Sequence, residues 1–147
     1  MDLFNFEYAV KFVCGTWVKE FGDVVAPGIY FTAINIHNPT DGEVSFQYKI
    51  AVAKRGVGTK PSNPVDLKLG LDEALEIDCT DITKHSRPIE GEFRKGFVVI
   101  GSNVDLDVVA VYTAAGGDGQ IVSIHIERVA PRRPLRLPPL PQPSEQA

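Results

Sequence analysis

The sequence predicts an all-β protein, an antiparallel β-sandwich of the Ig-like or jelly-roll-like kind with about seven strands. Two observations support this fold class. Apolar and polar residues alternate along most of the chain with the period of two that is typical of half-buried strands. Turn-forming residues interrupt these segments at short intervals, and no segment indicates a helix of more than about one turn.

The first three predicted strands cover residues 8–17, 29–38 and 44–53. Residues 44–53 show the clearest alternation, and residues 29–38 are rich in β-branched and aromatic side chains. In the stretch NPTDG, residues 38–42, the Asn, Pro, Asp and Gly residues each favour a turn. We therefore expect residues 29–53 to form a β-hairpin.

The middle of the chain predicts a loop, a strand and a short turn. Lys54–Pro64 is polar, contains two glycines and two prolines, and is the best candidate for a mobile loop. Residues 67–79 predict one amphipathic strand, because apolar residues alternate with acidic ones toward its end. A turn or 3₁₀ segment is expected at residues 80–84, with Thr80 or Asp81 as its cap.

Three further strands are predicted at residues 93–101, 104–114 and 120–129. The glycine-rich turn at residues 116–119 favours antiparallel pairing of the last two. The run Val108–Tyr112 is almost continuously apolar. Such a run indicates a central strand that is covered on both faces, or a strand whose second face lies in an interface.

The chain divides into a β-sandwich domain, residues 1–129, and a tail rich in proline, arginine and leucine, residues 130–147. The tail contains three of the 15 basic residues and one of the 19 acidic residues, so its net charge is +2 and that of the domain is −6. An acidic domain repels phosphate backbones, and we therefore expect no binding to nucleic acid.

The N-terminal residues and the two cysteines both indicate in which cellular compartment the protein is expected. The N-terminus lacks the basic region of a secretory signal, and no stretch reaches the ~20 apolar residues that span a bilayer. We therefore expect a cytoplasmic protein without membrane insertion. In a reducing cytoplasm Cys14 and Cys79 are expected to be free, buried, small apolar residues. A disulfide between two facing strands is the alternative, and a two-ligand metal site is less favoured because zinc takes four ligands.

Two groups of polar residues lie at strand spacing. Ser123, His125 and Glu127 share one strand face, and a His–carboxylate pair of this kind can bind a metal or transfer a proton. Strand alternation alone also explains them, and we favour a polar strand face. Asp105 and Asp107 likewise share a face, and surface charge is favoured over acid–base chemistry.

The sequence favours neither an enzyme nor a cofactor site. It contains no nucleophile elbow, phosphate-binding loop or dinucleotide-binding motif, so we expect no catalytic residue, metal or cofactor. An acidic run near the middle can attract calcium, but it has no EF-hand pattern, and a charged strand edge is the favoured interpretation. The members of this run are Asp72, Glu73, Glu76, Asp78 and Asp81.

The tail predicts a docking segment. Six of the 11 prolines fall in it, so it is expected to run as polyproline II. Leucines alternate with these prolines, although a solvent-exposed spacer needs none. Residues 131–136 also fit a PxxPx(basic) pattern of the kind that SH3 domains bind, and a plain extended terminus is the alternative. The residues expected to bind a partner are Arg132, Arg133, Pro134, Leu135, Leu137 and Leu140.

Three stretches, NPTDG, LGLDEALEIDC and GFVVIGSNVDLDVVAVYTA, together resemble small uncharacterised bacterial all-β proteins. The central two-thirds of the chain is also distantly similar to the sensory rhodopsin transducer type of β-sandwich, through Val99–Val104 and the apolar strand that follows. This resemblance implies a β-sandwich that forms oligomers and acts by binding partners. It implies no catalytic residues, and the tail lies outside the family pattern.

These observations predict a non-enzymatic structural or interaction module that forms a homo-oligomer or docks into a larger protein complex, with the tail as docking arm. The alternative is a β-sandwich that binds a small ligand or carbohydrate through the loop Lys54–Pro64, the turn Ala115–Gly119 and Trp17. Trp17 is included because an exposed tryptophan at a strand end commonly marks a binding surface.

Overall fold

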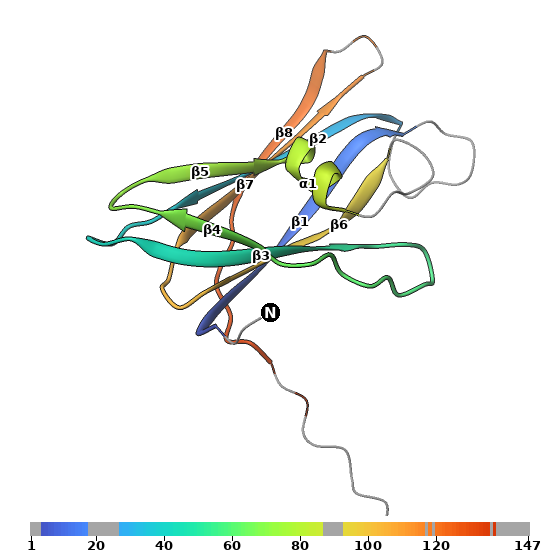
Figure 1. Ribbon diagram of the computed structural model, residues 1–147. Coiled ribbons are helices and arrows are strands. Elements are labelled where there is room, and N and C mark those ends of the chain that lie inside the picture. The colour runs from blue at the N-terminus through green and yellow to red at the C-terminus, as the bar shows by residue number, and fades with distance from the viewer. Residues whose placement is uncertain are drawn as a thin grey trace, which may run out of the picture.

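A computed structural model of the chain describes residues 4–17, 27–86, 93–116, 118, 120–135 and 137. Figure 1 shows a curled antiparallel sheet of eight strands, accompanied in the described part of the chain by one short helix. The all-β, antiparallel prediction is confirmed. The elements are β1 (Phe6–Trp17), β2 (Gly28–His37), β3 (Val44–Val52), β4 (Val65–Leu69), β5 (Ala74–Asp78), α1 (Cys79–His85), β6 (Arg94–Ser102), β7 (Asp107–Ala115) and β8 (Ile121–Arg128).

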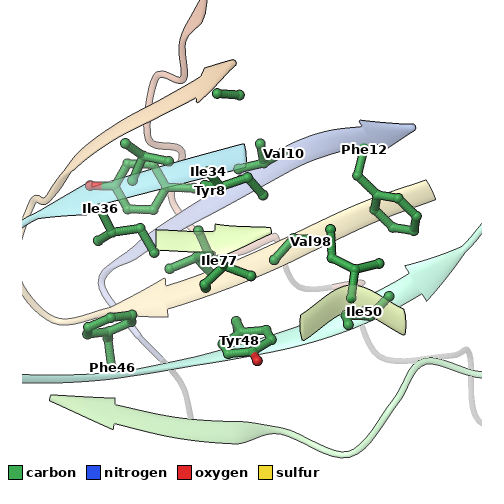
Figure 2. Packing of buried hydrophobic residues seen from close by; sticks show 14 of the residues in the cluster. Tyr8, Val10, Phe12, Ile34, Ile36, Phe46, Tyr48, Ile50, Ile77 and Val98 are labelled. Atoms are coloured by element: carbon green, nitrogen blue, oxygen red, sulfur yellow. The ribbon is translucent and has the colours of Figure 1, made fainter. Parts of the chain in front are cut away.

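The sheet follows the strand order β4-β3-β6-β1-β2-β7-β8, with β5 paired to β2 beside this path. β1 pairs with β6 over Phe6–Cys14, and its last residues, Gly15–Trp17, pair with Gly28–Tyr30 of β2. The sheet therefore has two halves: β4, β3, β6 and most of β1 form one, and β2, β5, β7 and β8 form the other together with the end of β1. The halves curl around one hydrophobic core, in which Figure 2 shows side chains of β1, β2, β3 and β5 meeting.

The core tolerates a buried tyrosine because its hydroxyl is fully bonded. Tyr8 is completely buried, and its hydroxyl donates to Asp105 Oδ1 at 2.5 Å. The same oxygen accepts from the backbone N–H of Leu106 at 2.7 Å. Burial raises the pKa of Tyr8, so the phenol stays protonated and keeps the donor role. Asp105 is therefore a core-supporting partner and not a plain surface charge.

The expected hairpin over residues 29–53 is wrong, because β2 does not pair with β3. Residues Ala33–His37 of β2 pair with β5 on one edge and with β7 on the other, which leaves no edge there for β3. β3 pairs instead with β4 and β6, in the other half of the sheet. The turn after β2 is held by buried Asn38, whose amide donates to the carbonyl oxygens of Gly42 at 2.7 Å and Gly70 at 2.9 Å.

The single strand expected over residues 67–79 is two strands in different halves of the sheet. β4 pairs with β3, β5 pairs with β2, and a turn at residues 70–73 separates them. In this turn Asp72 has a φ of 58°, and the Glu73 carboxylate accepts from Gly70 N–H at 2.7 Å. Alternation continues across the turn, so periodicity alone did not reveal the break.

The segment after β5 is a helix of seven residues, longer than the predicted turn. Its N-cap is Asp78, where the sequence suggested Thr80 or Asp81. Asp78 Oδ1 accepts from Thr80 N–H at 2.8 Å, while Asp81 Oδ2 accepts from Asp78 N–H at 3.0 Å. This reciprocal capping box satisfies backbone donors that the first turn leaves unpaired. Ile82 of the helix is fully buried and anchors it to the core.

The preferred expectation of free cysteines is wrong, because Cys14 and Cys79 form a disulfide. Their Cα atoms lie 5.7 Å apart, and the bond joins the end of β1 to the first residue of α1. Both residues are buried. Within the described residues, no helix combines the length and apolarity needed to cross a membrane.

Candidate functional site

The last strand, β8, is the most exposed element of the sheet. All eight of its residues are exposed, and among the described strands it pairs with β7 alone. Four large aliphatic side chains of β8 are largely exposed: Ile121 (63%), Val122 (71%), Ile124 (59%) and Ile126 (65%). Natural proteins normally protect an edge strand with charge, proline or a covering element. The charged residues of β8, Glu127 and Arg128, lie at its C-terminal end, and the stretch Ile121–Ile126 contains no Asp, Glu, Lys or Arg.

The pairing register turns the polar face of β8 inward and its apolar face outward. Val108 and Ala110 of β7 point into the core, and the same face of β7 places Tyr112 opposite His125. Val111, on the outer face, lies opposite Ile126. An amphipathic strand normally buries its apolar face, so this orientation is the reverse of the usual one.

The exposed aliphatic side chains continue across β7 to β2. An irregularity near Ala115 brings Ile121 opposite that residue, on the same face as Ile124 and Ile126. The same face of β2 carries two further large apolar residues, each more than one-third exposed. We call this surface the outer apolar face; it consists of Ile29, Phe31, Val111, Ile121, Ile124 and Ile126.

The polar face of β8 lines a groove of about 320 Å³ between the β7–β8 hairpin and β1. His125 stacks on Tyr112 with ring centroids 6.0 Å apart. The Tyr112 hydroxyl donates to the Lys11 carbonyl oxygen at 2.7 Å, which ties the hairpin to β1. His125 Nε2 lies 3.9 Å from Glu127 Oε2. The sequence-derived group Ser123, His125 and Glu127 thus lies together in this groove.

Two side chains that line the groove have shifted pKa values. Burial, reinforced by the Glu127 charge, raises the pKa of Tyr112 to about 12. Burial, with a smaller contribution from Lys95, lowers the pKa of Lys11. The distance between His125 and Glu127 exceeds that of a hydrogen bond. The described residues contain no cluster of three or more His, Cys, Asp or Glu side chains that could hold a metal.

A second polar cluster, which sequence reasoning missed, surrounds His37 at the end of β2. His37 Nδ1 lies 2.8 Å from Asp107 Oδ2, and His37 Nε2 lies 2.8 Å from Asp72 Oδ1. Arg128 lies on the far side of Asp107, with Nη2 2.7 Å from Oδ1. The hydrogen bond to Asp107, then that to Asp72, raises the pKa of His37. The hydrogen bond from His37 lowers the pKa of Asp107.

These contacts separate residues that the sequence grouped together. Asp105 bonds Tyr8 whereas Asp107 bonds His37, so the two aspartates do not act as a pair. In the acidic run, Asp72 bonds His37, Glu73 closes a turn, and Asp78 and Asp81 cap α1. No spacing in the sequence signals the His37 cluster, because its members come from four separate segments.

The tail begins by pairing with its own domain. Arg132 forms an antiparallel bridge with Glu7: its N–H donates to the Glu7 carbonyl oxygen at 2.9 Å, and its carbonyl accepts from Glu7 N–H at 2.8 Å. The Arg132 guanidinium also contacts Glu7 Oε1 at 2.6 Å. Of the expected partner-binding residues, Arg132 therefore has an intramolecular partner.

The other expected tail residues differ in their surroundings. Arg133 and Pro134 line a hollow of about 380 Å³ with Phe4–Phe6. Leu135 and Leu137 are 85% and 94% exposed. Leu140 lies outside the described residues.

The loop and tryptophan proposed as a ligand site do not line the same hollow. Residues 60–65 form a hollow of about 590 Å³ with Lys84–Ser86 at the end of α1. Trp17 is half-buried and packs on Phe93, with ring centroids 5.1 Å apart. In the turn Ala115–Gly119, Gly117 and Gly119 lie outside the described residues.

Comparison with known proteins identifies a shared fold. Neither a protein family nor a curated protein matches this chain. A solved structure with a similar fold is the crystal structure of Thermotoga maritima 1070, which has 8% sequence identity and a TM-score of 0.57. The similarity covers 90% of this chain and 98% of that chain. At this identity the likeness concerns the fold alone.

Proposed function

We propose that this protein is a non-enzymatic interaction module that assembles with itself or within a larger complex through β8 and the outer apolar face. The observation that carries the proposal is the orientation of β8, whose isoleucines point outward while Ser123, His125 and Glu127 point inward. A contiguous exposed apolar surface on a folded domain is typical of a protein–protein contact. In this proposal the curled sheet serves as a two-layered β-sandwich body.

The apolar strand β7 supports the same proposal. Val109 and Val111 belong to the outer side of β7 and are half-buried by their neighbours in the sheet. If the outer side of β7 lies in an interface, both faces of the strand are covered, which explains why the run Val108–Tyr112 is almost continuously apolar. The tail remains the proposed docking arm, with Arg132 holding its base on β1 while Leu135 and Leu137 stay exposed for a partner.

A second candidate is the binding of a small ligand or carbohydrate in the groove beside β8. It is favoured by an aromatic wall, Tyr30 and Tyr112, next to polar groups from Lys11, His125 and Glu127. Aromatic rings with a few polar groups are typical of small-molecule sites. Screening the wild type and Tyr112→Ala against a sugar and metabolite panel by thermal shift tests it. Binding that survives this substitution would place the ligand elsewhere.

The disulfide bears on the compartment. Disulfides persist in oxidising environments and are rare in the cytoplasm. We therefore propose that the protein works in an oxidising environment, in place of the expected cytoplasmic location. Alkylation of free thiols in intact cells tests this point: a protein that reacts at both Cys14 and Cys79 in its native location would contradict it.

The assembly proposal is tested by measuring the mass of the native protein with light scattering after size exclusion. We expect the wild type to be larger than one chain, and the double variant Ile124→Asp/Ile126→Asp to be a monomer. The matched control is Val57→Asp/Leu71→Asp, which changes two comparably exposed aliphatic residues in loops and should keep the wild-type mass. A chain ending at Val129 shows the contribution of the tail. A monomeric wild type and a monomeric truncated chain at high concentration would refute self-assembly.

A further inference from the structure

The open edge of β8 has a defined hydrogen-bonding pattern. Val129 N–H donates to the Val108 carbonyl oxygen at 2.9 Å, so this pair of residues is hydrogen-bonded across the ladder. Hydrogen-bonded and non-bonded pairs alternate in an antiparallel ladder. The backbone groups of Glu127 and His125 therefore face β7, and those of Ile124 and Ile126 face away from it. The open edge thus offers its free N–H and C=O groups at the isoleucine positions.

We infer that two copies of this chain pair antiparallel through their β8 edges, with Ile124 opposite Ile124 of the second copy. This inference rests on the proposed function and specifies its interface. The occupant is a second copy because the strand complements itself: a two-fold axis at Ile124 brings Val122 opposite Ile126 and Ser123 opposite His125. Three apolar pairs result, Ile124–Ile124 and two Val122–Ile126 pairs, the latter beside the irregularity of the β7–β8 ladder at Ala114/Ala115. Ile121 comes opposite Glu127, and no like charges meet.

Neighbouring registers are less favourable. A two-fold axis at His125 places the two imidazoles opposite each other and sets Val122 opposite Arg128. An axis at Ser123 sets Ile126 opposite Gln120. A register shifted from the Ile124-centred one by an odd number of residues is excluded, because it places the apolar side chains of one copy on the same face as the polar side chains of the other. The His125 axis keeps two Ile124–Ile126 pairs, but of the three registers the Ile124-centred one alone sets each of Val122, Ile124 and Ile126 opposite an aliphatic residue.

The surroundings of β8 leave room for this pairing. Every residue of the strand is exposed on both faces, and the β7–β8 hairpin extends away from the rest of the sheet at its turn end (Figure 1). Edge pairing makes the outer apolar faces of the two copies continuous, so the dimer still presents an apolar surface. That surface is available for the larger assembly proposed above.

Single-cysteine crosslinking tests the register. Residues that face each other in a hydrogen-bonded antiparallel pair have Cα atoms about 5.5 Å apart, within the range that a disulfide spans. The two native cysteines are already paired with each other, so Ile124→Cys adds the one free thiol. Under mild oxidation we expect most of this variant to become a covalent dimer on a non-reducing gel.

Matched variants separate edge pairing from random collision. Val122→Cys and Ile126→Cys alone should give little dimer, because each faces the other position in the second copy, and the double variant should crosslink. His125→Cys crosslinking in place of Ile124→Cys would overturn the proposed register. Ile124→Pro, which removes a donor on the open edge only, should give a folded monomer by light scattering and circular dichroism.

The outcomes distinguish this inference from the proposed function. A wild type that is monomeric at all concentrations overturns edge pairing and the self-assembly part of the proposed function, and leaves docking into a larger complex as its remaining form. A wild-type oligomer in which Ile124→Cys does not crosslink and Ile124→Pro still assembles overturns edge pairing alone, and places the contact on the outer apolar face or on the tail. Loss of the oligomer on truncation at Val129, with Ile124→Cys unlinked, assigns it to the tail.

Discussion

His125 lies opposite Tyr112 across the β7–β8 ladder, and their rings stack with centroids 6.0 Å apart. This pairing sets the orientation of the whole last strand, because neighbouring residues of a strand point to opposite faces. With His125 on the inner side, Ile124 and Ile126 must point outward. The exposed apolar surface is therefore a consequence of register and not of composition.

The first prediction concerns pH and His37. Its pKa is raised above the ordinary value of 6.5 by the hydrogen bonds to Asp107 and Asp72. A group whose pKa is higher in the folded state stabilises that state below the unfolded pKa, and this contribution disappears as the pH rises through the folded pKa. A neutral imidazole has one N–H and can donate to only one of the two carboxylates.

We therefore expect the urea midpoint of the wild type to fall as the pH rises above 6.5, and that of His37→Gln to depend less on pH in this range. His125→Gln is the control, because that histidine has no hydrogen-bonded carboxylate at comparable distance. Asp107 contributes with the opposite sign: its lowered pKa stabilises the fold above the ordinary value of 3.8, and this contribution is lost on acidification. Identical pH profiles for wild type and His37→Gln would contradict the role of this cluster.

The second prediction concerns the disulfide. Cys14 and Cys79 are separated by 65 positions, and a crosslink that closes a loop of this size stabilises by about 4 kcal/mol through the lower entropy of the unfolded chain. Cys14→Ala/Cys79→Ala should lower the free energy of unfolding by roughly this amount. Urea unfolding measures the loss, and the reduced wild type should behave like the double variant. A native protein with two titratable thiols would show that the bond is absent.

The third prediction concerns the base of the tail. Arg132→Ala removes the ion pair with Glu7 but leaves the two backbone hydrogen bonds of the bridge. We expect a loss of under about 1 kcal/mol in the free energy of unfolding, as for other partly exposed ion pairs. Amide exchange at Glu7 should become faster. Arg133→Ala serves as the control and should leave that exchange rate unchanged.

The fourth prediction concerns Gly96, where the backbone of β6 leaves no space for a Cβ beside β3. A Cβ at this position would meet the Ala51 carbonyl oxygen at 2.1 Å, and the φ of 159° is one that other residues rarely adopt. Gly96→Ala should therefore destabilise the fold by about 3 kcal/mol, because backbone atoms must move. Gly42→Ala is the control, since a Cβ there meets nothing within 4 Å. A thermal midpoint of Gly96→Ala equal to that of Gly42→Ala would contradict the close approach.

Local patterns predicted the strands well where one face is buried. Residues 44–53 alternate cleanly, and β3 is found at Val44–Val52 with its apolar residues in the core. The final strand was also predicted, and its antiparallel pairing with β7 is confirmed. The break between β4 and β5 was missed because Leu69 and Leu75 continue one alternation across a turn. Whether a strand continues or breaks at such a position depends on the turn geometry and on which strands pair, and neither can be read from the alternation of nearby residues.

By itself the amino-acid sequence determined the all-β class, most strand positions and the absence of recognisable catalytic motifs, since these depend on the periodicity and backbone preferences of nearby residues. Only the tertiary structure decided that β2 pairs with β5 and β7, that Cys14 meets Cys79, and that His37 lies between Asp72 and Asp107. These contacts join segments far apart in the chain, and many pairings satisfy the same alternation. The direction in which β8 presents its isoleucines belongs to this second group, because a shift of one residue in the register would turn them toward the core side.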